Sequence, residues 1–461
     1  MISTKVFNPE HDMALANGDK HFIAPRNIRE MAHDLAPLME FVEEDGVLVW
    51  GWDHAIKSQL LRMGVAAETL PTDGALTALR QCSERASAHR LLHAFHADHP
   101  DGPYIGESIL AHSLDDVAAY ASRHGHIILK DPLSSSGKGL RHVNEGGLPL
   151  PLSQPKVDAR TFRSLAQRGK ARGRSQGGGT SEPSEQSGGG MSSFSSSLEK
   201  VKNWANALIR RHGYLTAEPY YNKVQDFAME YCVREGQCRF IGYSLFNTNA
   251  HGRYESNLLM KDEKIETLLT QYIPHSALHE VRDWVITHFT HIIPAEWDTT
   301  HHPLYFGIDM MVVMTTDDGQ QITDRISACE CYVNLHTNPP ASAAEQKTKF
   351  TSELKIQNSE FKLHPCVEIN LRLNMGIIAH EVHRALLAPG TEGSFHVTAF
   401  PTEEAAQQFH RKHTEQFPTT YCEGKIASGY HALTPILPLT RHHAYIMIKP
   451  EPFSPIIERP Q

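Results

Sequence analysis

The stretch from Ile127 to Val143 constrains the fold of this chain more than any other. Its apolar start ends in Lys130, a turn rich in serine and glycine follows, and a second strand-like run completes it. Such a turn offers N–H groups and hydroxyls to phosphate oxygens, and the lysine adds a compact positive charge. An ordinary Ser/Gly hairpin turn would look the same. A Walker A loop is disfavoured, because Pro132 and Gly139 stand where that motif needs Gly and Ser or Thr.

A second stretch, Pro365–Gly376, alternates polar and apolar residues. With the two-residue period of a strand, Glu368, Asn370 and Arg372 share one face, and the opposite face is apolar. A carboxylate and an amide oxygen two residues apart are hard ligands suited to Mg²⁺. An arginine beside them can bind an anionic substrate or stabilise developing negative charge. An edge strand with a solvated polar face would show the same alternation.

Three further acidic residues lie on predicted strands. Asp309 stands inside the apolar run Tyr305–Met314, where an unpaired charge is costly, so we expect a cation or a hydrogen-bonding partner beside it. It is the natural companion of the Glu-x-Asn pair above. Asp226 and Glu230 share one face of another predicted strand, and plain solvation would explain either of them alone.

The composition excludes several classes of protein. The 461 residues carry 44 Lys and Arg against 53 Asp and Glu, a net charge of −9 without a dominant basic block, so nucleic acid is not the expected partner. No apolar run approaches the roughly 20 residues that span a bilayer. The N-terminus lacks the pattern of a signal peptide, so we expect a cytoplasmic location. Seven cysteines without a C-x-x-C pair fit reduced thiols, and the scattered histidines give a His-based metal site little support.

The chain length predicts two or three domains. Residues 1–100 read as an open α/β domain, with a buried strand at 47–50 and a helical pattern over 28–41. Residues 169–197 hold nine serines and eight glycines and predict a disordered loop, followed by a helix that stops at Gly213. Residues 315–362 predict a polar insertion between strands.

Taken in chain order, these stretches resemble the ATP-grasp superfamily, which includes D-alanine:D-alanine ligases and biotin carboxylases. The likeness spans roughly residues 80–376, and Phe7–Ala16 adds a resemblance to one family of bacterial ATP-grasp proteins. It implies an α+β ATP-grasp fold of two subdomains that clasp ATP, preceded by an α/β pre-ATP-grasp domain. The implied boundaries are 1–100 for that first domain, 101–215 for the lid subdomain and 216–461 for the C-terminal subdomain.

The same resemblance implies roles for individual residues. Lys130 would contact the α-phosphate, Arg85 is the basic residue ahead of a helix, and Arg372 lies where substrate-side arginines are found. The flexible lid over the β- and γ-phosphates would comprise Ser134, Ser135, Ser136, Gly137 and Gly139. The adenine hinge would fall at Glu218 and Tyr220, the ribose ligand would be Asp226 with Glu230 in reserve, and the magnesium ligands would be Asp309, Glu368 and Asn370.

The function that the resemblance implies is ligation of a carboxylate to an amine. ATP, with two Mg²⁺ ions, would activate the carboxylate as an acyl phosphate, with release of ADP and phosphate, and the partners would be small molecules or peptides. A non-catalytic ATP-binding scaffold and a phosphotransferase of the same fold are the alternatives. No oligomeric state follows from the sequence.

Two positions depart from the family pattern. Between Asp309 and Glu368 lie 58 residues, so their pairing requires that segment to be looped out; otherwise Glu330 and Asn334 compete as ligands. Gly307 stands where several amino-acid ligases carry an arginine that stabilises the tetrahedral intermediate. Its role would then pass to Arg372 or to Arg253.

Overall fold

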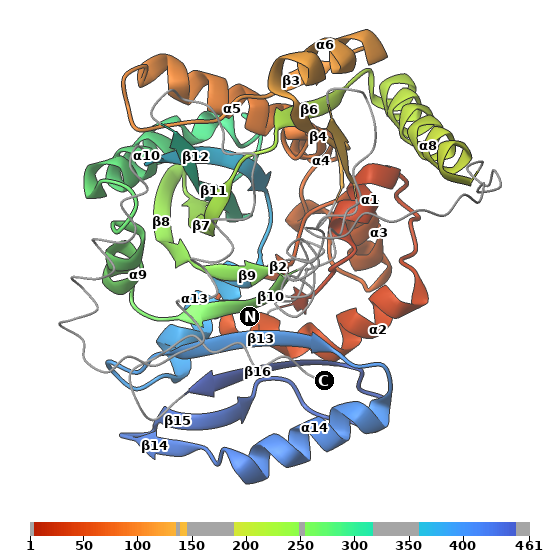
Figure 1. Ribbon diagram of the computed structural model, residues 1–461. Coiled ribbons are helices and arrows are strands. Elements are labelled where there is room, and N and C mark those ends of the chain that lie inside the picture. The colour runs from red at the N-terminus through yellow and green to blue at the C-terminus, as the bar shows by residue number, and fades with distance from the viewer. Residues whose placement is uncertain (1–3, 135–138, 145–188, 249–253, 317–358, 449–461) are drawn as a thin grey trace, which may run out of the picture. The chain divides into compact units, whose positions relative to one another are not determined.

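The computed structural model describes residues 4–134, 139–144, 189–248, 254–316 and 359–448 (Figure 1). The chain forms two compact units. The larger comprises Met1–Leu110, Asp131–Gly139 and Tyr220–Gln461, and the smaller comprises Ala111–Lys130 and Leu140–Pro219. The smaller unit overlaps most of the predicted lid subdomain 101–215, whereas the predicted domains 1–100 and 216–461 fall within one unit. The predicted Arg253, Glu330 and Asn334 lie outside the described residues.

An antiparallel sheet of order β12-β11-β7-β8 forms the centre of the larger unit. Its strands are β7 (Lys223–Arg234), β8 (Gln237–Ser244), β11 (Leu304–Thr316) and β12 (Ser359–Asn370). Strands β7 and β8 are joined at Glu235 and Gly236, whose φ values of 51° and 70° suit a tight hairpin turn. From Phe227 to Val233 one face of β7 is buried, because Phe227, Met229 and Tyr231 point into the core.

The helices that contribute to the core on this sheet include α5 (Arg85–Asp98), α9 (Asp262–Leu269) and α10 (His275–His288), which the short 3₁₀ helix η3 (Phe289–His291) follows. Leu92 of α5, Leu269 of α9 and Leu278 of α10 are each almost completely buried in the same apolar cluster as the sheet. The amphipathic faces of these helices thus hold the sheet from which the polar residues of the site project.

A second sheet in the larger unit has the order β14-β15-β16-β13-β10-β9. Helix α13 (Met375–Leu386) shares its apolar cluster, with Ile377 and Val382 fully buried beside Phe395. Helix α14 (Glu403–Gln416) also belongs to this region. The strands are β9 (Phe246–Thr248), β10 (Tyr254–Leu259), β13 (Gly393–Ala399), β14 (Thr420–Cys422), β15 (Lys425–Ala432) and β16 (His442–Ile448).

The first hundred residues form a parallel pair, β1 (Thr4–Val6) with β2 (Val47–Val49), and several helices. The strand predicted at 47–50 is confirmed. The helical pattern over 28–41 is divided into α2 (Arg26–Leu35) and η1 (Ala36–Phe41), because Pro37 cannot continue the α-helical hydrogen bonding. The other elements are α1 (His11–Asn17), α3 (His54–Arg62), η2 (Ala67–Thr69) and α4 (Asp73–Cys82).

These N-terminal elements share cores with the rest of the larger unit. Trp52, Ile56 and Leu76 lie in the apolar cluster of the β7–β12 sheet, and Leu38 lies in the cluster of α13. This shared packing explains why residues 1–100 do not form a compact unit of their own.

The smaller unit contains a sheet of order β3-β6-β4-β5, with β3 at its border. Its elements are β3 (Ile109–Ala111), α6 (Leu114–His124), β4 (His126–Lys130), β5 (Leu140–Asn144), α8 (Gly189–His212) and β6 (Leu215–Pro219). Strands β4 and β5 are antiparallel, as the strand–turn–strand pattern predicted, with Lys130 opposite Leu140.

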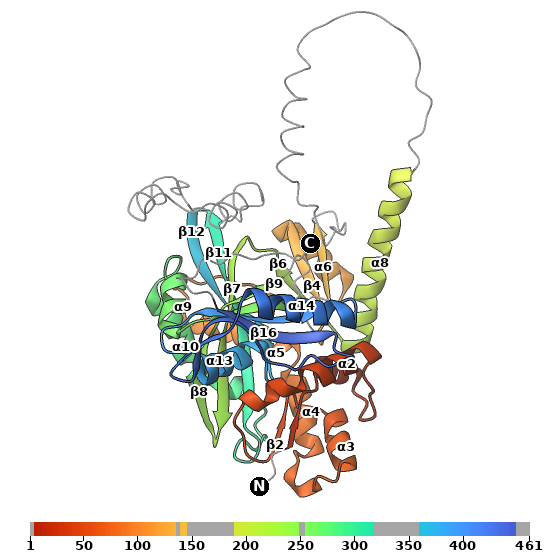
Figure 2. The same ribbon diagram turned by 90° about the horizontal axis from the view of Figure 1, so that it is seen from below.

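Helix α8 begins earlier than the sequence indicated (Figure 2). The predicted loop covered 169–197; residues 169–188 lie outside the described part of the chain, and 189–197 are helical, which corrects that end of the prediction. Propagating an existing helix costs far less than nucleating one, so poor helix formers can extend the amphipathic segment that follows. Its buried Ala205 and Leu208, and the stop at Gly213, are as predicted.

The predicted insertion 315–362 is shorter at both ends in the structure. Residues 317–358 lie outside the described ranges, but Thr315 pairs with Glu360 and Val313 with Lys362 in the β11–β12 ladder. Threonine and apolar residues favour strands, so the ladder extends into the segment that its polarity had marked as a loop.

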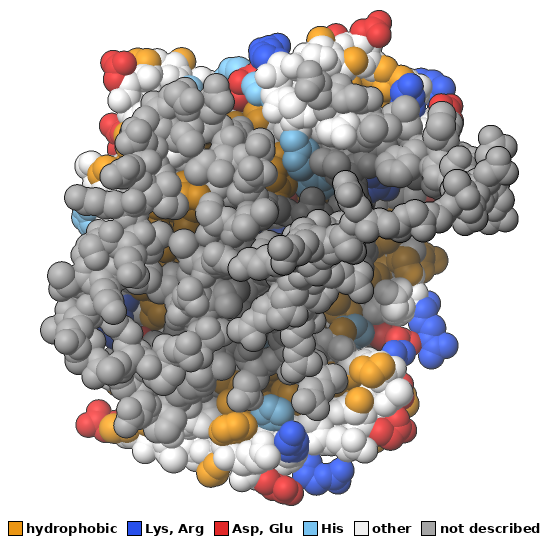
Figure 3. Space-filling view, viewed as in Figure 1, with side chains coloured by type: hydrophobic (Ala, Val, Ile, Leu, Met, Phe, Trp, Pro, Cys, Tyr) orange, Lys and Arg blue, Asp and Glu red, His pale blue; other side chains and the backbone are white. Residues whose placement is uncertain are grey.

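Among the described residues, no helix combines the length and the apolar character that crossing a bilayer requires. In Figure 3, basic and acidic side chains are interspersed over the described part of the face shown.

Candidate active site

The paired strands β11 and β12 bring the three predicted metal ligands together. Asp309 lies directly opposite Glu368 in the ladder, and Gly307 lies opposite Asn370. Asn370 Nδ2 donates a hydrogen bond to Asp309 Oδ1 over 3.2 Å. Asp309 and Glu368 therefore pair although 58 residues lie between them in the sequence, as their joint role as ligands requires.

The local electrostatics favour a cation beside these carboxyl groups. Burial, followed by the charges of Glu368 and Asp226, raises the pKa of Asp309 to about 7, and the hydrogen bond from Asn370 offsets only part of this. Neighbouring carboxylates repel each other, and a divalent cation removes that repulsion while accepting oxygen ligands. The donor set of two carboxylates and one amide oxygen thus fits Mg²⁺.

Arg85 links this acidic group to the residues that follow β4. It is the first residue of α5 and is almost completely buried. Its Nη1 lies 3.1 Å from Glu368 Oε2, its Nε donates to the carbonyl of Asp131 over 3.0 Å, and its backbone N–H donates to the carbonyl of Pro132 over 3.0 Å. The predicted basic residue ahead of a helix therefore contacts a predicted metal ligand.

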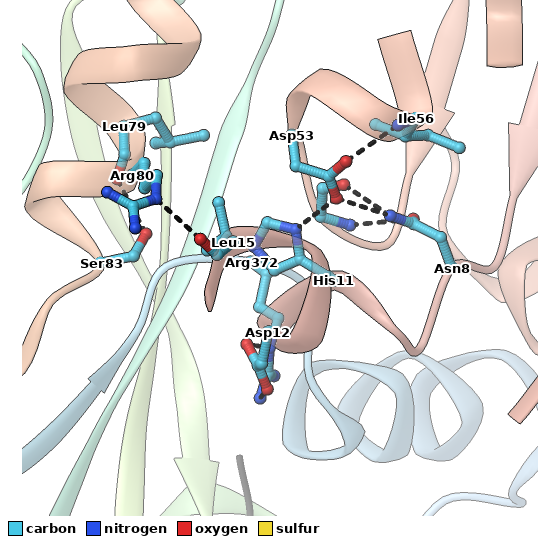
Figure 4. A network of polar contacts seen from close by, with 11 residues as sticks. Asn8, His11, Asp12, Leu15, Asp53, Ile56, Leu79, Arg80, Ser83 and Arg372 are labelled. Atoms are coloured by element: carbon cyan, nitrogen blue, oxygen red, sulfur yellow. Dashed lines mark hydrogen bonds and ion pairs between the residues drawn. The ribbon is translucent and has the colours of Figure 1, made fainter. Parts of the chain in front are cut away.

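Arg372 is held by Asp12 in a bidentate pair (Figure 4). Its Nε and Nη2 donate to the two Asp12 oxygens over 3.1 and 3.0 Å, and Nη2 also donates to Asn370 Oδ1 over 3.2 Å. Burial alone would raise the pKa of Asp12, but the charge and hydrogen bonds of Arg372 outweigh it and lower that pKa below its ordinary value. The guanidinium is thus fixed beside the proposed metal ligands.

These groups line one pocket of the larger unit. It encloses about 480 Å³ of space not filled by atoms, open solvent included. Two cationic and several acidic side chains border it, so it suits an ionic ligand. The polar lining comprises His11, Asp12, Ser83, Glu84, Arg85, Ser134, Glu368, Asn370 and Arg372.

Most of the polar residues after the first strand stabilise the structure. His11 Nδ1 lies 3.0 Å from Asp53 Oδ2, and both side chains are buried. Asp53 Oδ1 also accepts from the backbone of Ile56 and so caps α3, while Asn8 bonds to the backbone of Gly51 on both sides of its amide (Figure 4). This network positions α1, from which Asp12 reaches Arg372.

Glu230, the predicted reserve ribose ligand, is enclosed in the structure. The residue is only 2% exposed, and its Oε2 accepts a 2.6 Å hydrogen bond from Asn374 Nδ2. Burial raises the pKa of Glu230 to about 8, although the bond from Asn374 opposes the shift. Its role toward ribose stays a prediction. Asp226 remains half-buried on the same strand, in an ion pair with Lys223.

Gly307 is explained by the same buried carboxyl. A Cβ on Gly307 would lie 2.4 Å from Glu230 Oε2 and 2.5 Å from Asn374 Nδ2. This pair thus fills the space beside Gly307, the position at which the resemblance in the sequence pointed to an arginine in several amino-acid ligases. The strand pattern of Pro365–Gly376 did not single out Asn374, although an asparagine just before an apolar helical run is a cap signal. Its Oδ1 accepts hydrogen bonds from the backbone N–H groups of Gly376 and Ile377.

In the smaller unit, the predicted Lys130 and Glu218 form a buried ion pair on adjacent strands. The turn that follows β4, Asp131–Gly139, belongs to the larger unit. In it, Ser134 Oγ is buried and has no hydrogen-bond partner among the described residues, and a Cβ on Gly139 would lie 2.2 Å from this oxygen. An unpaired hydroxyl fits an oxygen-rich ligand. Tyr220 is half-buried. The predicted Ser135, Ser136 and Gly137 lie outside the described residues.

No protein-family model matches the chain, and no curated protein matches it. Among solved structures it is similar to an N5-carboxyaminoimidazole synthetase of Staphylococcus aureus complexed with ADP, at 8% identity and a TM-score of 0.41, covering 97% of this chain and 93% of the other. A biotin carboxylase of Campylobacter jejuni matches at 11% identity and a TM-score of 0.40, covering 97% of this chain and 81% of the other. An L-amino acid ligase of Bacillus licheniformis matches at 9% identity and a TM-score of 0.38, covering 97% of this chain and 93% of the other. Likeness this distant transfers neither activity nor residue roles.

Proposed function

We propose that this chain is an ATP-grasp enzyme that joins a carboxylate to an amine and releases ADP and phosphate. One observation carries the proposal: the β11–β12 ladder sets Asp309 opposite Glu368 and within hydrogen-bonding distance of Asn370, beside a pocket that also presents Arg85 and Arg372. Oxygen ligands for a cation next to fixed guanidinium groups suit the transfer of a phosphoryl group.

Each group has a chemical task in this proposal. Asp309, Glu368 and Asn370 would hold magnesium, which supplies positive charge to the phosphates when bound. Arg372 is pre-oriented by Asp12, so it needs no reorganisation to stabilise an oxyanion. Lys130, held by Glu218, would bind phosphate as a point charge.

The reaction has two steps. A carboxylate oxygen of the substrate bonds to the γ-phosphorus as the bond to the ADP oxygen breaks, which yields an acyl phosphate. The amine nitrogen then bonds to the acyl carbon, phosphate leaves, and the nitrogen loses a proton. Positioning and charge neutralisation supply most of the rate in such transfers, so no side-chain nucleophile is needed.

The test is a screen of amino acids and small peptides for substrate-dependent ADP release. Glu368→Gln keeps the side-chain shape but removes the charge, and we expect it to lower turnover at least about 100-fold, as loss of a group that stabilises transition-state charge does. Glu255→Gln, which changes an exposed carboxylate on β10, is the matched control and should leave turnover unchanged. Wild-type turnover in Glu368→Gln would contradict the metal assignment.

A non-catalytic ATP-binding protein is the second candidate, and the filled space at Gly307 favours it. It would bind MgATP, and so gain thermal stability with the nucleotide, but would release no ADP with any pair of substrates. A flat melting temperature at saturating MgATP would contradict both candidates.

A further inference from the structure

Helices α9 and α10 are neighbours in the larger unit (Figure 1). They bring two histidines and a glutamate together outside the pocket described above. His275 Nε2 lies 3.0 Å from Glu266 Oε2, and His279 Nε2 lies 3.2 Å from Glu266 Oε1. The potential ligand atoms of the three residues all lie within 4.8 Å of one another. None of these residues has a task in the proposed ligase reaction.

The spacing of these atoms suits a small cation. Ligand atoms about 2.0–2.1 Å from a tetrahedral metal ion lie roughly 3.3 Å from one another, from the geometry of such sites. The two histidine–glutamate distances are close to that value. The ligand atoms lie within 4.8 Å of one another, so binding a metal ion requires them to approach by at most about 1.5 Å.

The backbone of both helices is anchored. His275 is the first residue of α10 and His279 follows one turn later, so both imidazoles project from one helix face. Ala277 and Leu278, which lie between them, are fully buried, as is Leu269 at the end of α9. The three ligands thus stand on rigid elements, as a pre-organised site requires.

The glutamate is also oriented by a neighbour. Tyr243, whose side chain is 4% exposed, donates a 2.9 Å hydrogen bond to Glu266 Oε1. Such a supporting hydrogen bond is what metal-binding carboxylates usually have.

We propose that Glu266, His275 and His279 bind a divalent transition-metal ion of the Zn²⁺ class. Two imidazole nitrogens and one carboxylate form a donor set that suits zinc or cobalt and not magnesium. The His275 side chain is 56% exposed, so water can reach the ion and complete its coordination. The ion would join α9 to α10 at the edge of the central core.

The experiment is a titration of the metal-free full-length chain with Zn²⁺ by calorimetry, in excess Mg²⁺ so that the Asp309 site does not compete. We expect one equivalent to bind, and both His279→Gln and Glu266→Gln to weaken that binding at least about tenfold. His93→Gln is the matched control and should leave Zn²⁺ binding unchanged. His89 and His93 are spaced on α5 as His275 and His279 are on α10, with rings 4.4 Å apart, but His89 bonds to the hydroxyl of Ser108 and not to a carboxylate.

Tyr243→Phe gives a second, milder test, because the loss of a supporting hydrogen bond typically weakens metal affinity 10–100-fold. Replacing Zn²⁺ by Co²⁺ should also produce the visible absorption of a tetrahedral site in the wild type and not in His279→Gln. No binding by the wild type, or equal binding by the wild type, His279→Gln and Glu266→Gln, would overturn the proposal. None of these readouts depends on ligase activity.

Discussion

The substitution Gly307→Ala is the sharpest test of how the structure holds its buried carboxyl group. The new Cβ would lie 2.4 Å from Glu230 Oε2 and 2.5 Å from Asn374 Nδ2, distances that real Cβ contacts essentially never reach. Both atoms belong to one hydrogen bond of 2.6 Å, and Asn374 is also the N-cap of α13. The clash therefore acts on a bond and a cap together.

The size of the effect follows from these two losses. A lost N-cap costs about 0.5–2 kcal/mol. A buried polar group left without its partner costs about 1–3 kcal/mol. Because Gly376 closes the other side of Glu230, where a Cβ would lie 2.2 Å from Oε1, the carboxyl has little room to move aside. We expect Gly307→Ala to lower the free energy of unfolding by about 2–4 kcal/mol.

Urea unfolding of Gly307→Ala, Glu230→Ala and the double variant measures this loss of unfolding free energy. Glu230→Ala removes one of the clashing groups, so the cost of Gly307→Ala should shrink by at least about 1 kcal/mol in that background, within the usual range for residues in contact. Gly74→Ala, in helix α4, is the control. The atom nearest to its Cβ would be Thr72 Oγ1 at 3.9 Å, so this substitution should be neutral or stabilising. Additive effects of Gly307→Ala and Glu230→Ala would refute the reasoning.

Three further outcomes are expected, all measured by chemical denaturation. Burial lowers the pKa of His443 to about 3, so only the unfolded chain gains this proton as the pH falls below about 6.5, and stability falls with it. His443→Gln should therefore lose about 2 kcal/mol less than the wild type between pH 7 and pH 5, and an equal loss would contradict this. Arg85→Lys should cost about 1–3 kcal/mol, because lysine cannot reach both Glu368 and the Asp131 carbonyl; an unchanged midpoint would contradict it. Asp53→Ala should cost about 2–4 kcal/mol through the α3 cap and the bond from His11, and a loss below 1 kcal/mol would contradict that account.

Local patterns predicted the strands of the site well. The period-two alternation around Glu368 and the apolar run around Asp309 both became strands, because side-chain alternation is a property of each strand alone. Their pairing across 58 residues was predicted from chemistry, since Asp309 needed a companion, and from the resemblance to the ATP-grasp superfamily. The helix over 28–41 was predicted too long because the effect of Pro37 was not weighed.

Contacts between segments far apart in the sequence could not be predicted from local sequence patterns. Asp12 and Arg372 are 360 residues apart, and Glu230 and Asn374 are 144 apart. No periodicity connects such pairs, because they meet only when separate elements pack together. Glu230 was therefore expected to be accessible on a polar strand face, although α13 and its cap enclose it.

The ladder between β11 and β12 continues from Asp309 and Glu368 as far as Thr316 and Ser359. These ladder pairs stand between the two acids and the ends of their strands, so strand pairing fixes the position of Asp309 against Glu368. A protein engineer can therefore alter the sequence that joins Thr316 to Ser359 and use the ladder as the anchor that keeps the acids in register.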